Sequence, residues 1–255
     1  MNLVIGIPSA GNPAQPFLES LQHLALPQSV TGFDHITVTG NYVPAQRELL
    51  ARHALSVKSD YLLMIDDDIV LPADTLTKLL SIFENAPRAG VAGGLYYARD
   101  GIRPMVVAGW NALDTTSAYT PAFGHDPVEV DGVGFGCVLI KCAAFKAMDE
   151  PYFSAQVFLE KSMRRVRVCN EDYLFCKRAA EAGFTTYLHA GVRLGHYDRG
   201  TGTTFPLAWE NDEATNHARM SVMQDGKFAL VPVDENVPRV DERHMRANLD
   251  YIIED

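Results

Sequence analysis

The sequence has few cysteines, and their spacing excludes several roles. The four cysteines among its 255 residues are Cys137, Cys142, Cys169 and Cys176, and no two of them have the CxxC spacing of zinc sites. We therefore predict buried, reduced thiols rather than disulfides or structural zinc. Such cysteine usage is typical of a cytoplasmic protein.

The sequence also lacks long apolar segments. No stretch is apolar over the length that a membrane-spanning helix needs. The N-terminus, MNLVIGIPSAGN, has no basic region ahead of an apolar stretch and predicts a first strand rather than a signal peptide. We expect a cytoplasmic protein without a membrane span.

Positive charge is in short supply. Twenty-two Lys and Arg residues stand against 32 Asp and Glu residues, for a net charge of −10. This balance argues against nucleic acid or an anionic membrane as the main partner. Anionic small molecules remain possible, because a bound metal ion can invert the local field.

Apolar runs of strand length alternate with amphipathic segments, a pattern typical of parallel βαβ units. The predicted strands are 3–8, 35–39, 61–65, 90–97, 133–140, 185–188 and 191–194, with short β-like pieces at 104–108 and 128–130. The predicted helices are 16–26, 44–55, 73–83, 141–148 and 170–182, and residues 149–169 are predicted as a loop. We predict an open, twisted, mostly parallel α/β sheet flanked by helices, with a small antiparallel β element.

With 47% hydrophobic residues, the chain can bury the core of one large domain. We assign residues 1–204 to that domain, with halves at about 1–100 and 101–204. Residues 205–255 are predicted to be a C-terminal extension that packs on the domain or on a partner subunit, so an oligomer through it is possible.

Three adjacent aspartates, Asp66–Asp68, follow the apolar run of the segment YLLMIDDDIVLP. A buried strand should place them at its carboxyl end, where open α/β sheets bind ligands. Uncompensated, they would repel each other by several kcal/mol at an intermediate dielectric, which favours a divalent cation among them. Asp66 and Asp68 should face the same side of an extended strand end and suit Mg²⁺ or Mn²⁺. The alternative is a solvated acidic turn ahead of the next helix.

The segment NEDYLFCKRAAEAGF begins the predicted helix 170–182 with two acids and ends it at Gly183, a C-cap. Asp172 is a candidate general base aimed into the cleft. Glu171 would then face outward or bind substrate. Both acids could equally be ordinary dipole-complementing residues at a helix start.

Two further segments have both a functional and an ordinary structural interpretation. His196 ends a predicted strand and could complete a mixed oxygen and nitrogen metal site, although most lone histidines are surface or satisfied core residues. The stretch DGVGFGC, 131–137, is rich in glycine, which allows backbone to approach a ligand closely, or it is simply a tight turn.

Together, and in this order, these segments resemble a glycosyltransferase of the GT-A fold and family-2 type over residues 3–198. The matching pieces are VIGIPSAG, the segment AQRE at 45–48, YLLMIDDDIVLP, GVGFGCVLI, NEDYLFCKRAAEAGF and the strand that ends in His196. The resemblance implies transfer of a sugar from a nucleotide-diphosphate sugar, with Mn²⁺ or Mg²⁺ as cofactor.

The resemblance also implies site residues. For the donor, these are Pro8, Ser9, Arg47, Asp66, Asp67, Gly134, Phe135 and Gly136. For the metal, they are Asp66, Asp68 and His196. Asp172 matches the base of inverting members, although a retaining enzyme would use it to orient the acceptor.

Some features depart from the family pattern or stay open. No acid follows the second predicted strand, at 39–41, where many uridine-binding relatives have one. This absence argues against UDP as the donor nucleotide and leaves GDP or another nucleotide open, so we expect a donor of the UDP or GDP type with an unknown acceptor. Arg199 is a candidate phosphate ligand on a lid, 199–204, or lies on an ordinary loop. Trp110 and Glu171 are candidate acceptor contacts, and Trp110 and Trp209 could stack on sugars or simply pack.

Two other functions fit part of the pattern. Asp66 and Asp68 after an apolar strand also suit a haloacid-dehalogenase-type phosphatase, whose motif closes the first strand of its domain, whereas here two strand–helix units precede it. A non-catalytic nucleotide-sugar-binding protein would keep the site without transfer.

Overall fold

The computed structural model describes residues 1–99, 101, 104–107, 126–160, 165–206, 219–224, 227–232 and 251–252. Side chains are described in these ranges except at 158–168 and beyond 206. Trp110 and Trp209 therefore lie outside the described residues.

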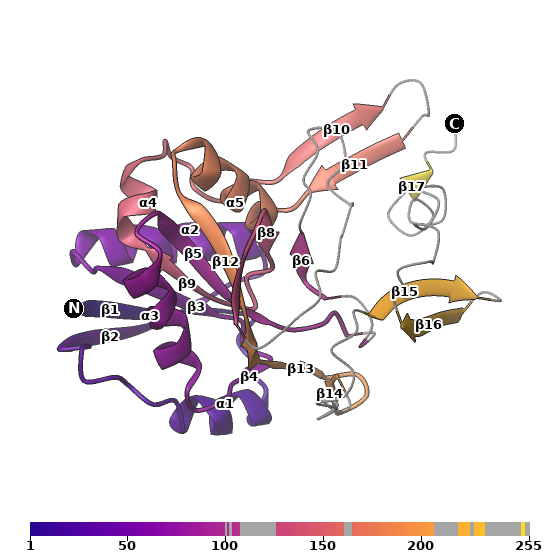
Figure 1. The fold of residues 1–255 in the computed structure, drawn as a ribbon, viewed down its shortest axis with the longest axis horizontal. Coiled ribbons are helices and arrows are strands. Elements are labelled where there is room, and N and C mark those ends of the chain that lie inside the picture. The colour runs from indigo at the N-terminus through magenta and orange to yellow at the C-terminus, as the bar shows by residue number, and fades with distance from the viewer. Residues whose placement is uncertain are drawn as a thin grey trace.

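A seven-stranded mixed sheet forms the centre of the fold, in the order β2-β1-β3-β9-β5-β12-β7 (Figure 1). Its strands are β1 (Asn2–Ser9), β2 (Gly32–Thr39), β3 (Tyr61–Ile65), β5 (Ala89–Leu95), β7 (Pro127–Val130), β9 (Cys137–Lys141) and β12 (Thr185–Arg193). Strands β2, β1 and β3 are parallel to one another, as are β5 and β12, while β9 lies antiparallel between β3 and β5 and β7 lies antiparallel to β12. The predicted α/β sheet is confirmed.

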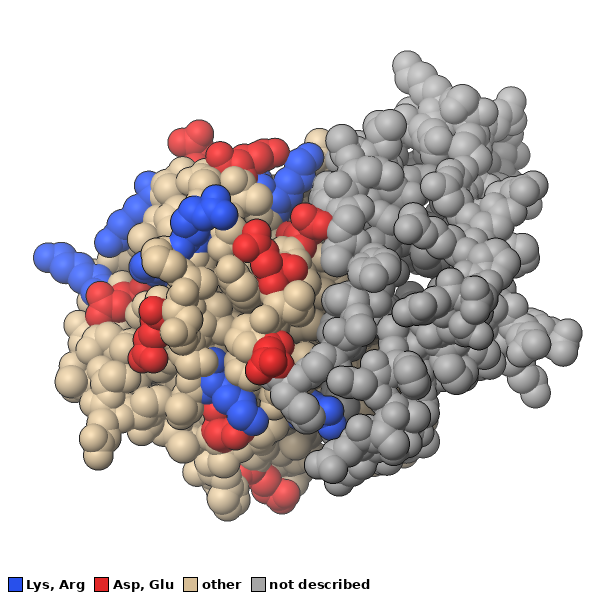
Figure 2. Space-filling view, viewed as in Figure 1, with Lys and Arg blue, Asp and Glu red and all other residues tan. Residues whose placement is uncertain are grey.

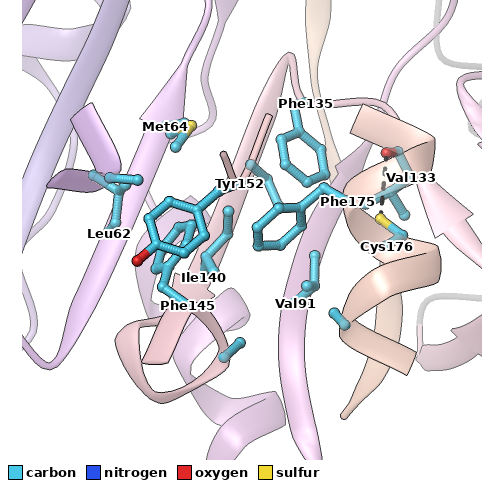
Figure 3. Close-up of a cluster of buried hydrophobic side chains, with 14 of the residues drawn as sticks. Leu62, Met64, Val91, Val133, Phe135, Ile140, Phe145, Tyr152, Phe175 and Cys176 are labelled. Carbon is cyan, nitrogen blue, oxygen red and sulfur yellow. Dashed lines mark hydrogen bonds between the residues drawn. The ribbon is translucent and has the colours of Figure 1, made fainter. Parts of the chain in front are cut away.

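Helices cover both faces of the sheet. They are α1 (Gln15–Gln22), α2 (Val43–Ser56), α3 (Thr75–Asn85), α4 (Cys142–Lys146) and α5 (Glu171–Glu181). Helices α2, α4 and α5 bury their apolar residues in one cluster, and α1 and α3 bury theirs in a second cluster. In the first, Phe135, Phe145 and Phe175 pack in the cluster beside the sheet (Figure 3). Phe153 stacks on Phe175 with 4.9 Å between ring centroids.

The position of β3 in the interior of the sheet explains why its sequence is apolar throughout. Leu62 and Met64 lie in one cluster, and Leu63 and Ile65 lie in the other. A strand that is covered by helices on both faces has no solvent-exposed face, so polar and apolar residues do not alternate along it.

Three predictions about strands were wrong. The predicted strand 133–140 is divided into β8 (Gly132–Val133) and β9, and the predicted strands 185–188 and 191–194 form one strand, β12. His189 pairs with Gly94 and Arg193 pairs with Leu95, so residues 190–192 form an irregularity in the pairing with β5 without ending the strand. Part of the predicted loop 149–169 is a hairpin of β10 (Gln156–Glu160) and β11 (Arg165–Cys169), which projects from the body of the fold (Figure 1).

Smaller strands complete the fold. Strands β4 (Ile69–Val70), β13 (Gly195–Asp198) and β14 (Thr203–Phe205) form the small antiparallel sheet that the sequence predicted. Strand β6 (Val106–Val107) pairs with β8. In the C-terminal region, β15 (Arg219–Gln224) pairs with β16 (Lys227–Pro232), and β17 (Tyr251–Ile252) pairs with β11.

Within the described ranges, no helix is long and apolar enough to cross a membrane. All four cysteines are buried as free thiols. On the face in Figure 2, acidic and basic side chains both occur over the described surface, so the negative net charge does not produce a uniformly acidic face there.

Candidate active site

The candidate site lies at the edge of the sheet where β1, β3, β5 and β12 end. The three aspartates directly follow β3, as predicted, but they are not extended. The amide of Ile69 donates to the carbonyl oxygen of Asp66 at 3.1 Å, so Asp66–Asp68 stand in a tight turn. The expectation that Asp66 and Asp68 face the same side was based on strand geometry, and a turn does not preserve that geometry.

Each of the three aspartates contacts a different arginine. The pairs are Asp66 with Arg47, Asp67 with Arg199, and Asp68 with Arg99. The sequence argument treated the three charges as uncompensated, and that assumption was wrong. Arginines from three distant segments supply the positive charge at this sheet edge.

Arg47 is the most deeply buried of these arginines, with 4% of its surface exposed. Its guanidinium donates to both carboxylate oxygens of Asp66, at 3.0 and 3.1 Å, and to Glu171, and it lies 5.6 Å from the ring centroid of Phe135. Burial alone would lower the pKa of Arg47, but Asp66 and Glu171 outweigh it and raise that pKa. Arg47 therefore links the end of β3 to the start of α5.

Asp172 lies in the first turn of α5 and is 7% exposed. Its carboxylate accepts a hydrogen bond from the amide of Tyr173 at 2.8 Å. Burial raises the pKa of Asp172 to about 6, and the nearby charge of Arg47 offsets part of that rise. A carboxyl with this pKa is ionised at neutral pH and is still basic enough to accept a proton.

Glu171 does not face outward. Its side chain is 14% exposed and turns inward onto Arg47. The neighbouring acids of α5 therefore have different surroundings, since Glu171 forms an ion pair with Arg47, whereas Asp172 accepts a hydrogen bond from a backbone amide. This difference favours Asp172 as the group that exchanges protons.

Asp67 joins the first loop of the chain to Arg199. Its carboxylate accepts hydrogen bonds from the hydroxyl of Ser9 at 2.5 Å and from Arg199 at 2.6 Å. Arg199 also donates to the carbonyl oxygen of Asn12. Pro8 is buried at the end of β1 beside these groups. The side chain of Arg199 thus connects the start of the segment 199–204 to Asp67 and to the first loop of the chain.

His196 is brought to Asp68 by strand pairing. In the register of β13 with β4, His196 lies opposite Ile69. Its Nδ1 lies 2.9 Å from the carbonyl oxygen of Tyr97, which can only accept, so Nδ1 carries the proton and Nε2 faces Asp68 Oδ2 at 3.7 Å. Burial would raise the pKa of Asp68, but contacts with His196 and Arg99 hold it below its ordinary value.

The predicted metal ligands are only partly brought together. Asp66 is held by Arg47, and within the described part of the chain no three His, Cys, Asp or Glu side chains are arranged to hold a metal ion. Asp68 and His196 do form a two-donor pair. A histidine whose other ring nitrogen donates to a carbonyl is typical of metal ligation, and one carboxylate plus one imidazole suits Mn²⁺. The residues fit an ion whose remaining positions are filled from outside.

The glycine-rich stretch at 134–136 makes room for Tyr96. A Cβ atom on Gly134 would lie 2.3 Å from the Tyr96 hydroxyl, and one on Gly136 would lie 2.8 Å from Tyr96 Cζ. The Gly136 amide donates to that hydroxyl at 3.1 Å. The ring of Phe135 is fully buried in the core. Packing against Tyr96 thus explains these glycines, and their place beside a donor pocket stays a prediction.

Substitution of Gly134 by alanine should destabilise the protein by about 1–3 kcal/mol, because the new methyl group overlaps Tyr96. Tyr96→Phe removes the hydroxyl and should recover part of that loss in the double variant. Urea denaturation of the two single variants and the double variant measures this coupling. Gly200→Ala is the control, since its Cβ would meet Asp198 at an ordinary 3.5 Å. Additive effects in the double variant would contradict the overlap.

Sequence reasoning missed two residues that shape the site. The Gln46 side-chain amide donates to the carbonyl oxygens of Ser9 at 2.6 Å and Val38 at 2.9 Å, so it ties together the ends of β1 and β2. Gln46 belongs to the segment AQRE, which is one of the pieces that resemble the family, and this membership could have identified it as a site residue. Arg99 follows β5 in a turn, 31 residues from its partner Asp68, and no spacing pattern marks it.

Comparisons with known proteins agree with this architecture. Residues 28–224 match the family described as "Glycosyltransferase like family 2". The solved structure of A197 from STIV has a TM-score of 0.56 and 18% identity, covering 96% of this chain and 100% of that one. The structure of GalNAc-T7 with UDP, GalNAc and Mn²⁺ has a TM-score of 0.51 and 12% identity, covering 76% of this chain and 43% of that one. At these identities the likeness concerns the fold. No curated protein sequence matches the chain.

Proposed function

The chain belongs to the glycosyltransferase-like family 2, and from this premise we propose that it transfers a sugar from a nucleotide-diphosphate sugar to a hydroxyl acceptor, with inversion. The observation that carries the proposal is the position of Asp172. It is a buried carboxyl with a pKa of about 6, and its neighbour Glu171 is joined through Arg47 to Asp66, which follows β3. Direct displacement needs a base held at a fixed position relative to the donor, and this connection would supply it.

The donor would bind along the edge formed by β1 and β3. Pro8 and Ser9 would border the nucleotide base, and Asp66 and Asp67 would contact the ribose or the donor sugar. Arg199 would contact the phosphates, and Gly134–Gly136 would border the pocket for the donor sugar. The UDP in the GalNAc-T7 structure supports a nucleotide donor of the UDP type, and GDP is the alternative. Arg47, at 4% exposure, would act on the nucleotide through Asp66 rather than by direct contact.

Asp68 and His196 would hold Mn²⁺ or Mg²⁺, with Asp66 as the further predicted ligand. The Mn²⁺ in the GalNAc-T7 structure supports a divalent ion. Such an ion would supply positive charge to the departing diphosphate.

In the proposed reaction, Asp172 accepts the proton of the acceptor hydroxyl as its oxygen bonds to the anomeric carbon. The bond from that carbon to the phosphate oxygen breaks, and its electron pair leaves with the nucleoside diphosphate. Arg47 holds Glu171 and Asp66 in place, so the base helix and the donor strand keep a fixed relation. Glu171 and Trp110 are the proposed acceptor contacts.

The phosphatase alternative requires a free nucleophilic carboxylate at Asp66. Both oxygens of Asp66 instead accept hydrogen bonds from Arg47, which lowers their nucleophilicity. The transferase is therefore the better supported function.

A thermal-shift panel of UDP-, GDP-, CMP- and TDP-sugars, with and without Mn²⁺, tests the proposal. A donor present at a hundred times its dissociation constant should stabilise the protein by about 2.7 kcal/mol, and Mn²⁺ should strengthen the effect. Asp68→Ala should remove the dependence on Mn²⁺. If none of these sugars raises the melting temperature, the proposed function is wrong, and binding without transfer to any acceptor or to water would favour a non-catalytic binding protein.

A further inference from the structure

Arg99 stands in a turn that the fold holds firmly. The amide of Gly101 donates to the carbonyl oxygen of Ala98 at 2.8 Å, and Gly101 has a φ of +69°, which favours glycine. A Cβ atom there would lie 2.9 Å from the ring of Phe205 in β14, so the turn packs closely on the β13–β14 hairpin. These contacts hold the backbone at Ala98 and Gly101, on either side of Arg99, while the side chain of Arg99 is exposed.

The ion pair between Arg99 and Asp68 is unequal in burial. The side chain of Asp68 is 8% exposed, whereas that of Arg99 is 53% exposed. The backbone of Asp68 is held by a hydrogen bond from the Tyr197 amide at 2.8 Å. A buried carboxylate needs a partner, but an exposed guanidinium can return to water at small cost. Arg99 is therefore the member of the pair that can leave.

Arg99 contacts the same oxygen atom that His196 faces. The guanidinium donates to Oδ2 of Asp68, and Nε2 of His196 lies 3.7 Å from that same Oδ2. An ion shared by Asp68 and His196 would need this oxygen. The guanidinium of Arg99 and a divalent ion from solution would therefore compete for the same oxygen, Oδ2 of Asp68.

We propose that Arg99 is the internal counter-cation of Asp68 in the metal-free protein and competes with a divalent ion for that carboxylate. The proposal deepens the proposed function, since it concerns the metal site of the same enzyme. When the ion binds, Arg99 moves off Oδ2. Guanidinium groups bind phosphate well, so the displaced Arg99 is then placed to contact the diphosphate of the donor.

The other two arginines, Arg47 and Arg199, have further partners that hold them in place. Arg47 is buried and donates to two carboxylates, and Arg199 donates to a carbonyl oxygen as well as to Asp67.

Binding of Mn²⁺ alone to the full chain tests the proposal, with free Mn²⁺ measured by electron paramagnetic resonance. Arg99→Ala should lower the Kd for Mn²⁺ about fivefold, the factor expected when a competing ion pair of ordinary strength is removed. Arg99→Lys keeps a point charge and should give a smaller change. In an Asp68→Ala background the effect of Arg99→Ala should vanish.

Arg88→Ala is the matched control, because Arg88 is exposed beside the amino end of β5, at the opposite edge of the sheet. It removes the same charge without touching Asp68 and should leave the Kd nearly unchanged. Equal Kd values for the wild type and Arg99→Ala, or no Mn²⁺ binding by either, would overturn the proposal. Since no nucleotide sugar is present, the result is separate from the proposed function. Tight Mn²⁺ binding by Arg99→Ala without binding of any nucleotide sugar would contradict that function and leave the role of Arg99 standing.

Discussion

Asp172→Asn is expected to lower sugar transfer by about a hundred- to ten-thousand-fold, the usual contribution of a placed general base. Asparagine keeps the size of the side chain but accepts no proton from the acceptor hydroxyl. Donor binding should persist, because Asp172 lies on α5 rather than at the end of β3. Steady-state transfer kinetics, together with a thermal shift by the donor, separate the two effects.

The pH dependence of the wild type follows from the same carboxyl. Burial raises the pKa of Asp172 from 3.8 to about 6, so the base is ionised only above that value. We therefore expect kcat/KM to fall as the pH drops through about 6. The Asp172→Asn variant should lose this limb of the profile while keeping the residual rate.

As the pH rises through about 6, the free energy of unfolding should fall while the activity rises. A carboxyl whose pKa is raised by folding contributes stability below its unfolded pKa and loses it as the pH rises through the folded pKa. At pH 8 the ionised Asp172 costs up to about 3 kcal/mol, which Asp172→Asn should recover in part, and at pH 4 the two proteins should be similar. Urea denaturation at both pH values measures the difference.

Asp74→Asn supplies the control, since it makes the same chemical change at the start of α3, where Asp74 is 55% exposed and paired with Lys78. It should alter neither transfer nor the pH dependence of stability. If Asp172→Asn turned over at the wild-type rate, Asp172 would not be the base.

Features that depend on strand ends could be predicted from the sequence. A buried strand has to be apolar over its length, so YLLMI marks β3 and locates Asp66–Asp68 at its carboxyl end. The acids in its first turn marked the helix that carries Asp172. His196 was predicted to end a strand, and it instead lies within β13. Because parallel strands end at one edge of a sheet, residues distant in sequence were expected to meet there, and the pairing of β13 with β4 brings His196 beside Asp68.

Side-chain partners could not be predicted in this way. Asp68 meets Arg99 across 31 residues and Asp67 meets Arg199 across 132, and no local periodicity records either contact. The glycines at 134 and 136 signalled a close approach, but the sequence did not identify Tyr96 as the side chain that approaches them, and their place beside a donor pocket stays a prediction. Contacts between side chains distant in sequence depend on the complete tertiary structure, whereas the ends of strands and helices are determined largely by the neighbouring residues in the sequence.

Arg47→Met is expected to destabilise the protein by about 3–5 kcal/mol at pH 7, the usual cost of leaving a buried charge without its partner. Methionine fills similar space over Phe135 but leaves Asp66 and Glu171 facing each other without a cation. Burial already raises the pKa of Asp66 despite the opposing charge of Arg47. Without Arg47 that pKa rises further, so the loss of stability should be smaller at pH 5 than at pH 8. Urea denaturation at the two pH values tests this without any substrate.

Arg52→Met is the matched control, because Arg52 lies on the same helix, α2, but its side chain is 52% exposed. It pairs with the exposed Glu150 and with Glu48, which also accepts hydrogen bonds from the amides of Tyr152 and Phe153. Exposed pairs contribute about 0–1 kcal/mol each, so this variant should remain close to the wild type. Adding Glu171→Gln to Arg47→Met removes one of the two stranded carboxylates and should restore part of the lost stability. If Arg47→Met were no less stable than Arg52→Met, Arg47 would not be the cation that holds the end of β3 to the start of α5, and the fixed relation between donor strand and base would need another cause.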